Sequence, residues 1–269
     1  MDAAATVTVK RLYLGESALD ELDSVAVEEP LEIRVEGRNI AVIMRTPGHD
    51  EELAAGFLLT ENVIKKPQDV FEISVCPSTS EGKGNVVDVL LSGVNVEWES
   101  LTRHVFASSS CGICGKASID TVFQSFTSVA SEWKIDPEIL ASLPDKLRAA
   151  QETFDKTGGL HASALFDLEG NLIVLREDVG RHNALDKLLG YALQKGLLPL
   201  SQHILMVSGR VSFEITQKAL AGGIGMIAAV SAPSSLAVQF AEASGQTLIG
   251  FLRGKRMNVY THADRLKDF

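Results

Sequence analysis

The chain has 269 residues, of which 25 are Lys or Arg and 35 are Asp or Glu, so its formal net charge is −10. At about 150 residues per domain, this length accommodates one large domain or two modest ones. The negative charge argues against a long nucleic acid as a partner, because binding its phosphates relies on many Lys and Arg side chains. It does not exclude a small phosphate-bearing ligand.

Cysteine usage and hydropathy indicate the compartment. Three cysteines cannot form a disulfide framework in a chain of this length, and their odd number favours a reducing compartment. No basic segment followed by an apolar run opens the sequence, so we expect a cytoplasmic protein.

The segment between Lys218 and Glu242 has no charge and is long enough to span a bilayer. However, Gly222, Gly223 and Pro233 interrupt it, which predicts a buried strand and helix and no membrane insertion.

Residues 1–106 predict a small α+β domain. Residues 16–32 carry seven acidic side chains and no basic one, a pattern typical of a solvated face. Downstream, β-rich runs flank a turn at residues 37–39, and Pro47-Gly48 precedes an acidic first helical turn. The expected elements are strands at 31–36 and 40–45, a helix that starts with Asp50, Glu51 and Glu52, and strands at 70–76 and 86–91.

Residues 107–116 are small and polar without periodicity, which predicts a mobile loop that contains two of the three cysteines. After it, residues 117–269 alternate between helical and strand patterns, which predicts an α/β sandwich with helices on both faces of a sheet. The expected helices are a region from Asp136 to Gly158-Gly159 that is interrupted at Pro144, and 181–195, 213–221 and 235–243. The expected strands are 162–167, 172–176, 203–208, 226–231, 247–252 and 257–261.

The pair Cys111-Gly-Ile-Cys114 carries the clearest chemical signal. This spacing favours a reactive thiolate at the first cysteine, and the following helix start and Lys116 add positive potential. Such a thiolate accepts a sulfane sulfur as a persulfide, and the second thiol later releases that sulfur by closing a disulfide. Spacing alone leaves open a structural zinc site, for which Cys76 is the only further cysteine, and inert packing.

Two polar turns are candidate ligand sites. Residues 176–183 read as a strand-to-helix turn, where Asp178 or Asn183 caps a helix or where the polar side chains form a site at a strand end. A weaker interpretation is a metal held by Asp178, His182 and Asp186. Residues 208–214 repeat the strand–glycine–helix pattern, and such a turn binds anions through backbone amides with Arg210 as a bidentate donor.

A third candidate is a group of cations near the end of the chain. Arg253, Lys255 and Arg256 surround Gly254 at a strand end, which is typical of a charged hairpin tip or of a phosphate clamp.

Other chemistries are disfavoured. A zinc deaminase needs H-x-E, but His161 is followed by Ala162 and Ser163. A serine hydrolase needs a G-x-S-x-G elbow, which is absent from the sequence. A dinucleotide-binding fingerprint leads from a strand into a helix, whereas the glycines at 223–225 lead from a helix into a strand, so this function is also disfavoured.

Several short blocks of the sequence, taken together, resemble the formate dehydrogenase accessory sulfurtransferase (FdhD) family over nearly the whole chain. The matching blocks are 29–34 (EPLEIR), 45–57 (RTPGHDEELAAGF), 109–116 (SSCGICGK), 158–161 (GGLH), 176–183 (REDVGRHN), 208–212 (SGRVS) and 251–260.

The resemblance implies a sulfur carrier. Such proteins take sulfur from a cysteine desulfurase as a persulfide and pass it to the bis-molybdopterin guanine dinucleotide molybdenum cofactor of formate dehydrogenase, which a guanine nucleotide is expected to mimic. By position, Cys111 carries the persulfide and Cys114 is its helper. The segment assigned to the cofactor is matched by Phe251, Leu252, Arg253, Gly254, Lys255 and Arg256, and we add Arg210, His182 and Arg181 as further cofactor-binding candidates.

The family also implies a homodimer and a C-terminal three-layer α/β/α sandwich with a cytidine-deaminase-like fold. A fold shared with deaminases but lacking their zinc motif accounts for the absence of the H-x-E signature from this sequence.

Two alternative functions remain at this point. One is a non-catalytic chaperone that binds the molybdenum cofactor and delivers it to formate dehydrogenase without needing a thiol. The other is a zinc-stabilised binding domain.

Overall fold

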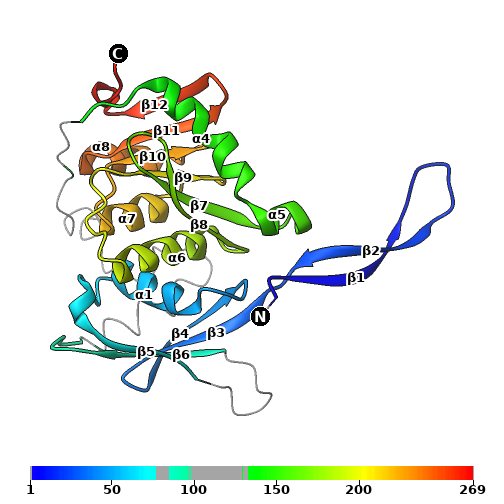
Figure 1. The fold of residues 1–269 in the computed structure, drawn as a ribbon, viewed down its shortest axis with the longest axis horizontal. Coiled ribbons are helices and arrows are strands. Elements are labelled where there is room, and N and C mark those ends of the chain that lie inside the picture. The colour runs from blue at the N-terminus through cyan, green and yellow to red at the C-terminus, as the bar shows by residue number, and fades with distance from the viewer. Residues whose placement is uncertain (1, 77–84, 97, 99–128, 130–132, 269) are drawn as a thin grey trace.

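The computed structural model describes residues 2–76, 85–96, 98, 129 and 133–268. These residues form a mixed α/β fold with three sheets (Figure 1). One sheet has two strands, a second has four strands in the order β4-β3-β6-β5, and the third has six strands in the order β12-β11-β10-β9-β7-β8. Helices separate the four-stranded sheet from the six-stranded one.

The predicted elements of the first part of the chain are confirmed. The hairpin, the acidic helix start and both later strands lie where the sequence placed them. The elements are β1 (Ala4–Arg11), β2 (Leu19–Ala26), β3 (Glu29–Val35), β4 (Arg38–Arg45), α1 (Asp50–Thr60), β5 (Val70–Cys76) and β6 (Val86–Leu91).

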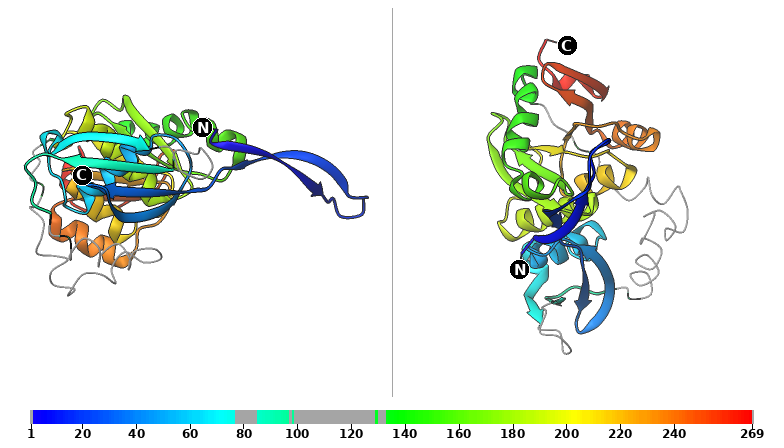
Figure 2. Two further views of the ribbon diagram at one scale, coloured as in Figure 1. Left: turned by 90° about the horizontal axis from the view of Figure 1, so that it is seen from below. Right: turned by 90° about the vertical axis from the view of Figure 1, so that its right-hand side faces the viewer.

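Sequence reasoning missed the hairpin of β1 and β2, whose strands pair antiparallel from Ala4–Ala26 to Arg11–Leu19. This hairpin projects from the body of the molecule as an arm (Figures 1 and 2). The acidic run at 16–32 is solvated as expected over the arm, since most side chains of β2 are exposed. The arm also exposes apolar side chains, among them Leu12, Leu14 and Leu22.

The second part of the chain also follows the prediction. Its elements are α4 (Pro137–Ala149), α5 (Glu152–Thr157), β7 (His161–Phe166), β8 (Leu172–Asp178), α6 (Arg181–Gln194), β9 (Ile204–Val207), α7 (Phe213–Ala221), β10 (Met226–Ala229), α8 (Ser235–Ser244), β11 (Thr247–Arg253) and β12 (Arg256–Thr261).

The expected interruption at Pro144 is wrong. Helix α4 continues through Pro144, and the helical region breaks instead between Ala149 and Glu152. A proline inside a helix costs one backbone hydrogen bond. Here the cost is offset by packing, because Leu140, Leu143 and Leu147 of the same helix are buried against the sheet.

Helices cover both faces of the six-stranded sheet, as predicted. One core cluster joins α4 to strand residues such as Ala164, Phe166 and Met206. The cluster on the other face joins α6, α7 and α8 to Leu165, Leu205 and Ile227. The cytidine-deaminase-like character of this sandwich stays a prediction.

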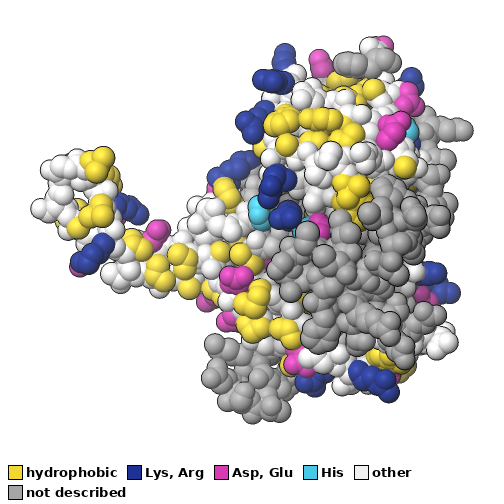
Figure 3. Space-filling model, turned by 180° about the vertical axis from the view of Figure 1, so that it is seen from behind, with side chains coloured by type: hydrophobic (Ala, Val, Ile, Leu, Met, Phe, Trp, Pro, Cys, Tyr) yellow, Lys and Arg dark blue, Asp and Glu magenta, His cyan; other side chains and the backbone are white. Residues whose placement is uncertain are grey.

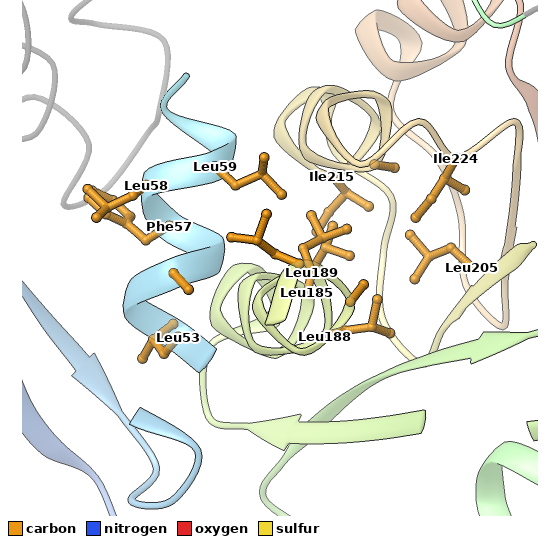
Figure 4. Packing of buried hydrophobic residues seen from close by; sticks show 14 of the residues in the cluster. Leu53, Phe57, Leu58, Leu59, Leu185, Leu188, Leu189, Leu205, Ile215 and Ile224 are labelled. Carbon is orange, nitrogen blue, oxygen red and sulfur yellow. The ribbon is translucent and has the colours of Figure 1, made fainter. Parts of the chain in front are cut away.

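Helix α1 connects the predicted N-terminal and C-terminal domains. It lies between the four-stranded sheet and α6, and its Leu53 and Leu58 belong to the same core cluster as Leu185 of α6 (Figure 4). Two glycines permit this approach. A Cβ at Gly56 would lie 1.8 Å from the Asp186 carbonyl oxygen, and one at Gly190 would lie 1.8 Å from the Glu52 carbonyl oxygen. The two predicted domains therefore share one core.

The uncharged segment after Lys218 forms the end of α7, the buried strand β10 and most of α8. This outcome confirms the predicted strand and helix. Among the described residues, no helix is both long and apolar enough to cross a membrane.

Candidate functional site

The candidate residues gather at one edge of the six-stranded sheet. Strands β9, β10 and β11 are parallel, and β8 runs in the same direction because β7 is antiparallel to both β8 and β9. The carboxyl ends of β8, β9, β10 and β11 therefore meet the amino ends of β7 and β12 at this edge. Open α/β sheets commonly bind ligands at the carboxyl ends of their strands.

The turn between β8 and α6 is held by the buried carboxylate of Asp178. One oxygen accepts hydrogen bonds from the backbone N–H of Gly180 at 2.8 Å and from Asn183 Nδ2 at 2.9 Å. The other oxygen accepts the backbone N–H of Thr46 at 3.1 Å and pairs with Lys187 Nζ at 2.7 Å. Both charged side chains of the ion pair are at most 1% exposed.

Thr46 belongs to the loop before α1, so Asp178 ties the first part of the chain to the start of α6. The Thr46 hydroxyl also accepts the backbone N–H of Val179, and its carbonyl accepts Lys187 Nζ at 2.8 Å. This network fixes the backbone that carries Arg181 and His182. The interpretation of Asp178 or Asn183 as the helix cap is wrong, because the N-cap is Gly180 and it makes no side-chain cap hydrogen bond. Asp178 instead holds the turn that precedes the helix.

The metal interpretation of Asp178, His182 and Asp186 does not fit the geometry. Asp178 pairs with Lys187, and Asp186 pairs with Lys218 Nζ at 2.8 Å and accepts a hydrogen bond from Thr60. Within the described part of the chain, no three His, Cys, Asp or Glu side chains are grouped to hold a metal ion.

The glycine turn after β9 has the predicted strand–turn–helix geometry. Ser208 Oγ accepts the backbone N–H of Ala162 at 2.9 Å, which ties this turn to the start of β7. Gly209 lies against His161, where a Cβ would be 3.1 Å from Nδ1. Arg210 follows with an exposed side chain, and Val211 forms a bridge to Pro233 after β10.

His161 was missed as a site residue by sequence reasoning, although it stands in the middle of the polar turns. Burial lowers the pKa of His161, and the positive charges of Arg181, His182 and Arg210 lower it further, whereas Asp178 opposes them. The imidazole is therefore held neutral at neutral pH. The three candidates Arg181, His182 and Arg210 thus all act electrostatically on this one ring.

His182 makes a small polar network with the start of α7. Its Nε2 lies 3.3 Å from Ser212 Oγ and 3.3 Å from a carboxylate oxygen of Glu214. The Ser212 hydroxyl donates to the same Glu214 oxygen at 2.8 Å. These contacts orient the His182 ring between the two helix starts.

The cationic segment forms the predicted hairpin tip between β11 and β12. Phe251 and Gly254 both have φ of +52°, and the Phe251 N–H donates to the Ser231 carbonyl at 3.1 Å. Arg253, Lys255 and Arg256 are exposed, and Arg253 Nε donates to the Val230 carbonyl at 3.3 Å. The Leu252 side chain is fully buried in the core, so any ligand contact there would be through its backbone.

Residues 26–267 match the model of the FdhD/NarQ family. The chain belongs to the FdhD/NarQ family. The predicted resemblance is thereby confirmed.

Relatives of this FdhD/NarQ chain match it over most of its length. A protein named sulfur carrier protein FdhD from Streptomyces avermitilis is 54% identical over 91% of this chain and 89% of its own length. One of the same name from Sulfolobus acidocaldarius is 46% identical over 97% of both. A crystal structure described as a formate dehydrogenase accessory protein from Desulfotalea psychrophila superimposes with a TM-score of 0.81 at 26% identity, covering 98% of this chain and 100% of that one.

The predicted cysteine pair of the FdhD/NarQ chain, Cys111 and Cys114, lies outside the described residues, as does the predicted loop 107–116. Cys76, at the end of β5, is half-buried and free. The structure thus brings Arg181, His182 and Arg210 together with His161. It places the 251–256 hairpin tip at the same edge of the sheet, farther along the strand order.

Proposed function

We propose that this chain is a sulfur carrier that serves formate dehydrogenase, with a cysteine desulfurase as donor and the bis-molybdopterin guanine dinucleotide cofactor as acceptor. Membership of the FdhD/NarQ family is the observation that carries this proposal, because relatives across most of the chain are named sulfur carriers. The Cys111-Gly-Ile-Cys114 pair supplies the chemistry, and the cations at the sheet edge supply a place for an anionic acceptor.

In the proposed loading step, the Cys111 thiolate attacks the terminal sulfur of the desulfurase persulfide. A new S–S bond forms at Cys111, the donor S–S bond breaks, and the desulfurase cysteine leaves as a thiolate. No net oxidation occurs, because the persulfide is only moved from one cysteine to another. Cys114 is the proposed helper in the later release of this sulfur.

The proposed acceptor carries pyrophosphate groups, which require cations and backbone N–H donors. Arg253, Lys255 and Arg256 project from the hairpin tip into solvent and, in the part of the chain that is described, make no ion pair with an acidic side chain. They therefore remain available for phosphate oxygens. Exposed cations without ion-pair partners are what the proposed phosphate clamp at residues 251–256 requires.

The loading step is tested by intact-mass and peptide-level mass spectrometry after incubation with a cysteine desulfurase and cysteine. We expect one added sulfur atom on Cys111 in the native chain and in Cys76→Ala, which is the matched control. We expect no added sulfur at this position in Cys111→Ser. Equal sulfur loading of Cys111→Ser at another cysteine, with unchanged formate dehydrogenase activation, would overturn the proposal.

A non-catalytic chaperone that delivers the molybdenum cofactor is the competing function, since the cationic edge serves it equally well. The double variant Cys111→Ala, Cys114→Ala separates the two functions. A carrier loses activation of formate dehydrogenase, whereas a chaperone keeps it in full. We further propose that the protein works as a homodimer in the cytoplasm, which sedimentation velocity and cell fractionation test.

A further inference from the structure

The arm formed by β1 and β2 stands apart from the two larger sheets. It is a ribbon of eight residue pairs, and neither of its strands pairs with another described strand. Figures 1 and 2 show that it projects from the body of the molecule. A two-stranded ribbon by itself is only marginally stable in water. The arm therefore has the properties of an element that a binding partner completes.

The outer edge of β1 offers backbone groups for strand pairing. The Val27 N–H donates to the Ala3 carbonyl at 3.0 Å, so these two opposite residues form a hydrogen-bonded pair. In an antiparallel ladder, such pairs alternate with pairs whose N–H and C=O groups point outward. The backbone groups of Thr6 and Thr8 therefore point away from β2, toward an edge where no described strand lies.

The sequence of β1 is suited to pairing with a second copy of itself, whereas that of β2 is not. Residues 4–9 (AATVTV) are uncharged, contain no Pro or Gly and are rich in β-branched side chains, which favours pairing at a strand edge. Strand β2 carries Asp20, Glu21 and Asp23, so two β2 strands would bring acidic side chains together. Because the chain has a net charge of −10, two copies repel each other least where their surfaces are uncharged.

We propose that the arm is a contact between two copies of this chain, in which the two β1 strands pair antiparallel about a two-fold axis at Thr6. This inference rests on the homodimer of the proposed function and names its surface. Pairing about Thr6 joins outward-pointing residues to each other and sets Lys10 opposite Asp2 of the partner subunit, so opposite charges meet at both ends of the contact. The product is one four-stranded sheet in the order β2-β1-β1-β2 with an isologous interface.

The tip of the arm carries apolar side chains that this arrangement buries. Residues 12–14 (LYL) are each at least 51% exposed. Arg11, the last residue of β1, lies about 17 Å from Thr6 along the strand, at about 3.3 Å per residue. The first residue of the strand, Ala4, lies only about 7 Å from Thr6 in the other direction. Each tip therefore passes the base of the other arm and reaches the body of the partner subunit.

An exposed apolar patch lies near the base of the arm. Strand β3 begins three residues after the end of β2, and its Pro30 pairs with Met44 of β4. Met44 and Val42 are 49% and 61% exposed, and they share one face because alternate residues of a strand point the same way. Figure 3 shows hydrophobic side chains at the tip of the arm, along it and at its base. Contact between a tip and this patch removes apolar surface of both copies from water.

The test measures the dissociation constant of the dimer by sedimentation velocity of the full chain over a range of concentrations. Thr6→Lys places two like charges opposite each other at the axis, so we expect this constant to rise tenfold or more, and we expect the same for Thr6→Glu. An equimolar mixture of these two variants is expected to form a heterodimer, because the axis then joins opposite charges. Ser24→Lys is the matched control, since Ser24 lies opposite Thr6 on β2, and we expect it to dimerise like the native chain.

The double variant Leu12→Ser, Leu14→Ser tests the tip, and we expect it to weaken the dimer tenfold or more with an unchanged far-UV circular dichroism spectrum. Recovery of the heterodimer shows that both Thr6 variants are folded.

Three results would overturn the contact. Native dimer affinity in both Thr6→Lys and Thr6→Glu would place the homodimer on another surface. An equal loss in Ser24→Lys would show that added charge anywhere on the arm suffices. A native chain that stays monomeric at micromolar concentration would overturn the homodimer as well. Cys111→Ser is expected to dimerise normally, so failure of sulfur loading and failure of the arm contact are separate results.

Discussion

Charged side chains serve opposite purposes in two regions of the molecule. The first region is the contact between α1 and α6 with the residues around it, which we call the seam, and the second is the carboxyl edge of the six-stranded sheet. Charged groups at the seam are buried or mostly buried, and each pairs with a partner from another element. Those pairs are Lys187 with Asp178 at 2.7 Å, Lys218 with Asp186 at 2.8 Å and Arg176 with Glu52 at 2.5 Å. At the edge, Arg210, Arg253, Lys255 and Arg256 are exposed, and no described carboxylate pairs with them.

This difference indicates that the charges at the seam stabilise the fold and that the charges at the edge serve function. A buried charge whose partner is removed costs several kcal/mol, whereas an exposed charge costs little when it is replaced. Charges at the seam therefore hold the two parts of the chain in place, and charges at the edge are available for a ligand. Edge substitutions that destabilise the fold as strongly as seam substitutions would contradict this difference in role.

The largest expected effect is on the buried pair at the seam. Lys187→Met leaves the Asp178 carboxylate buried without its cation and removes a donor to the Thr46 carbonyl. We expect a loss of about 3–5 kcal/mol in the free energy of unfolding, measured by urea denaturation. An unchanged denaturation midpoint would contradict the role of this pair.

The next effect concerns the close approach of the two helices. In Gly190→Ala, the new Cβ would overlap the Glu52 carbonyl oxygen, so α1 and α6 must move apart. We expect a destabilisation of about 1–3 kcal/mol, the usual cost of overpacking. Lys195→Ala, at an exposed position beyond the same helix, is the control and is expected to keep the native midpoint.

A smaller effect is a pH dependence of stability from His161. Its folded pKa lies below the ordinary value because of burial and the neighbouring cations. As pH falls below the ordinary histidine range near 6.5, the unfolded chain takes up a proton that the folded chain resists, so the free energy of unfolding falls. We expect His161→Asn to reduce this slope in urea titrations at a series of pH values, and an identical slope would contradict the assignment.

The smallest effect is on the edge itself. Arg210→Gln removes an exposed charge without a described ion-pair partner, so the free energy of unfolding is expected to stay within about 0.5 kcal/mol of the native value. Thermal denaturation without ligand checks this prediction. A loss comparable to that of Lys187→Met would show that Arg210 serves the fold.

Local patterns in the sequence predicted most elements. The strands at Val70–Cys76 and Val86–Leu91 and the helix start at Asp136-Pro137 match the structure, because alternation, capping and proline act locally. The sequence also placed residues 176–183, 208–214 and 251–256 at turns next to strand ends, and the sheet topology shows that these ends lie at one edge.

Features that depend on distant partners were not predictable in the same way. His161 is one histidine at a strand start, and its significance comes from cations at positions 181 and 210. Gly56 and Gly190 look like weak points of helices until each is seen against the backbone of the other helix. The helix through Pro144 persists because of leucines that pack under the sheet.

The most direct test of the central claim follows the sulfur atom itself. The chain is loaded with radiolabelled sulfur from cysteine by a desulfurase, freed of excess label and mixed with cofactor-bound formate dehydrogenase that lacks activity. We expect that label leaves Cys111, enters the formate dehydrogenase fraction and rises together with activity, and that Cys111→Ser transfers none. Full activation without transferred label would contradict sulfur carriage by this chain.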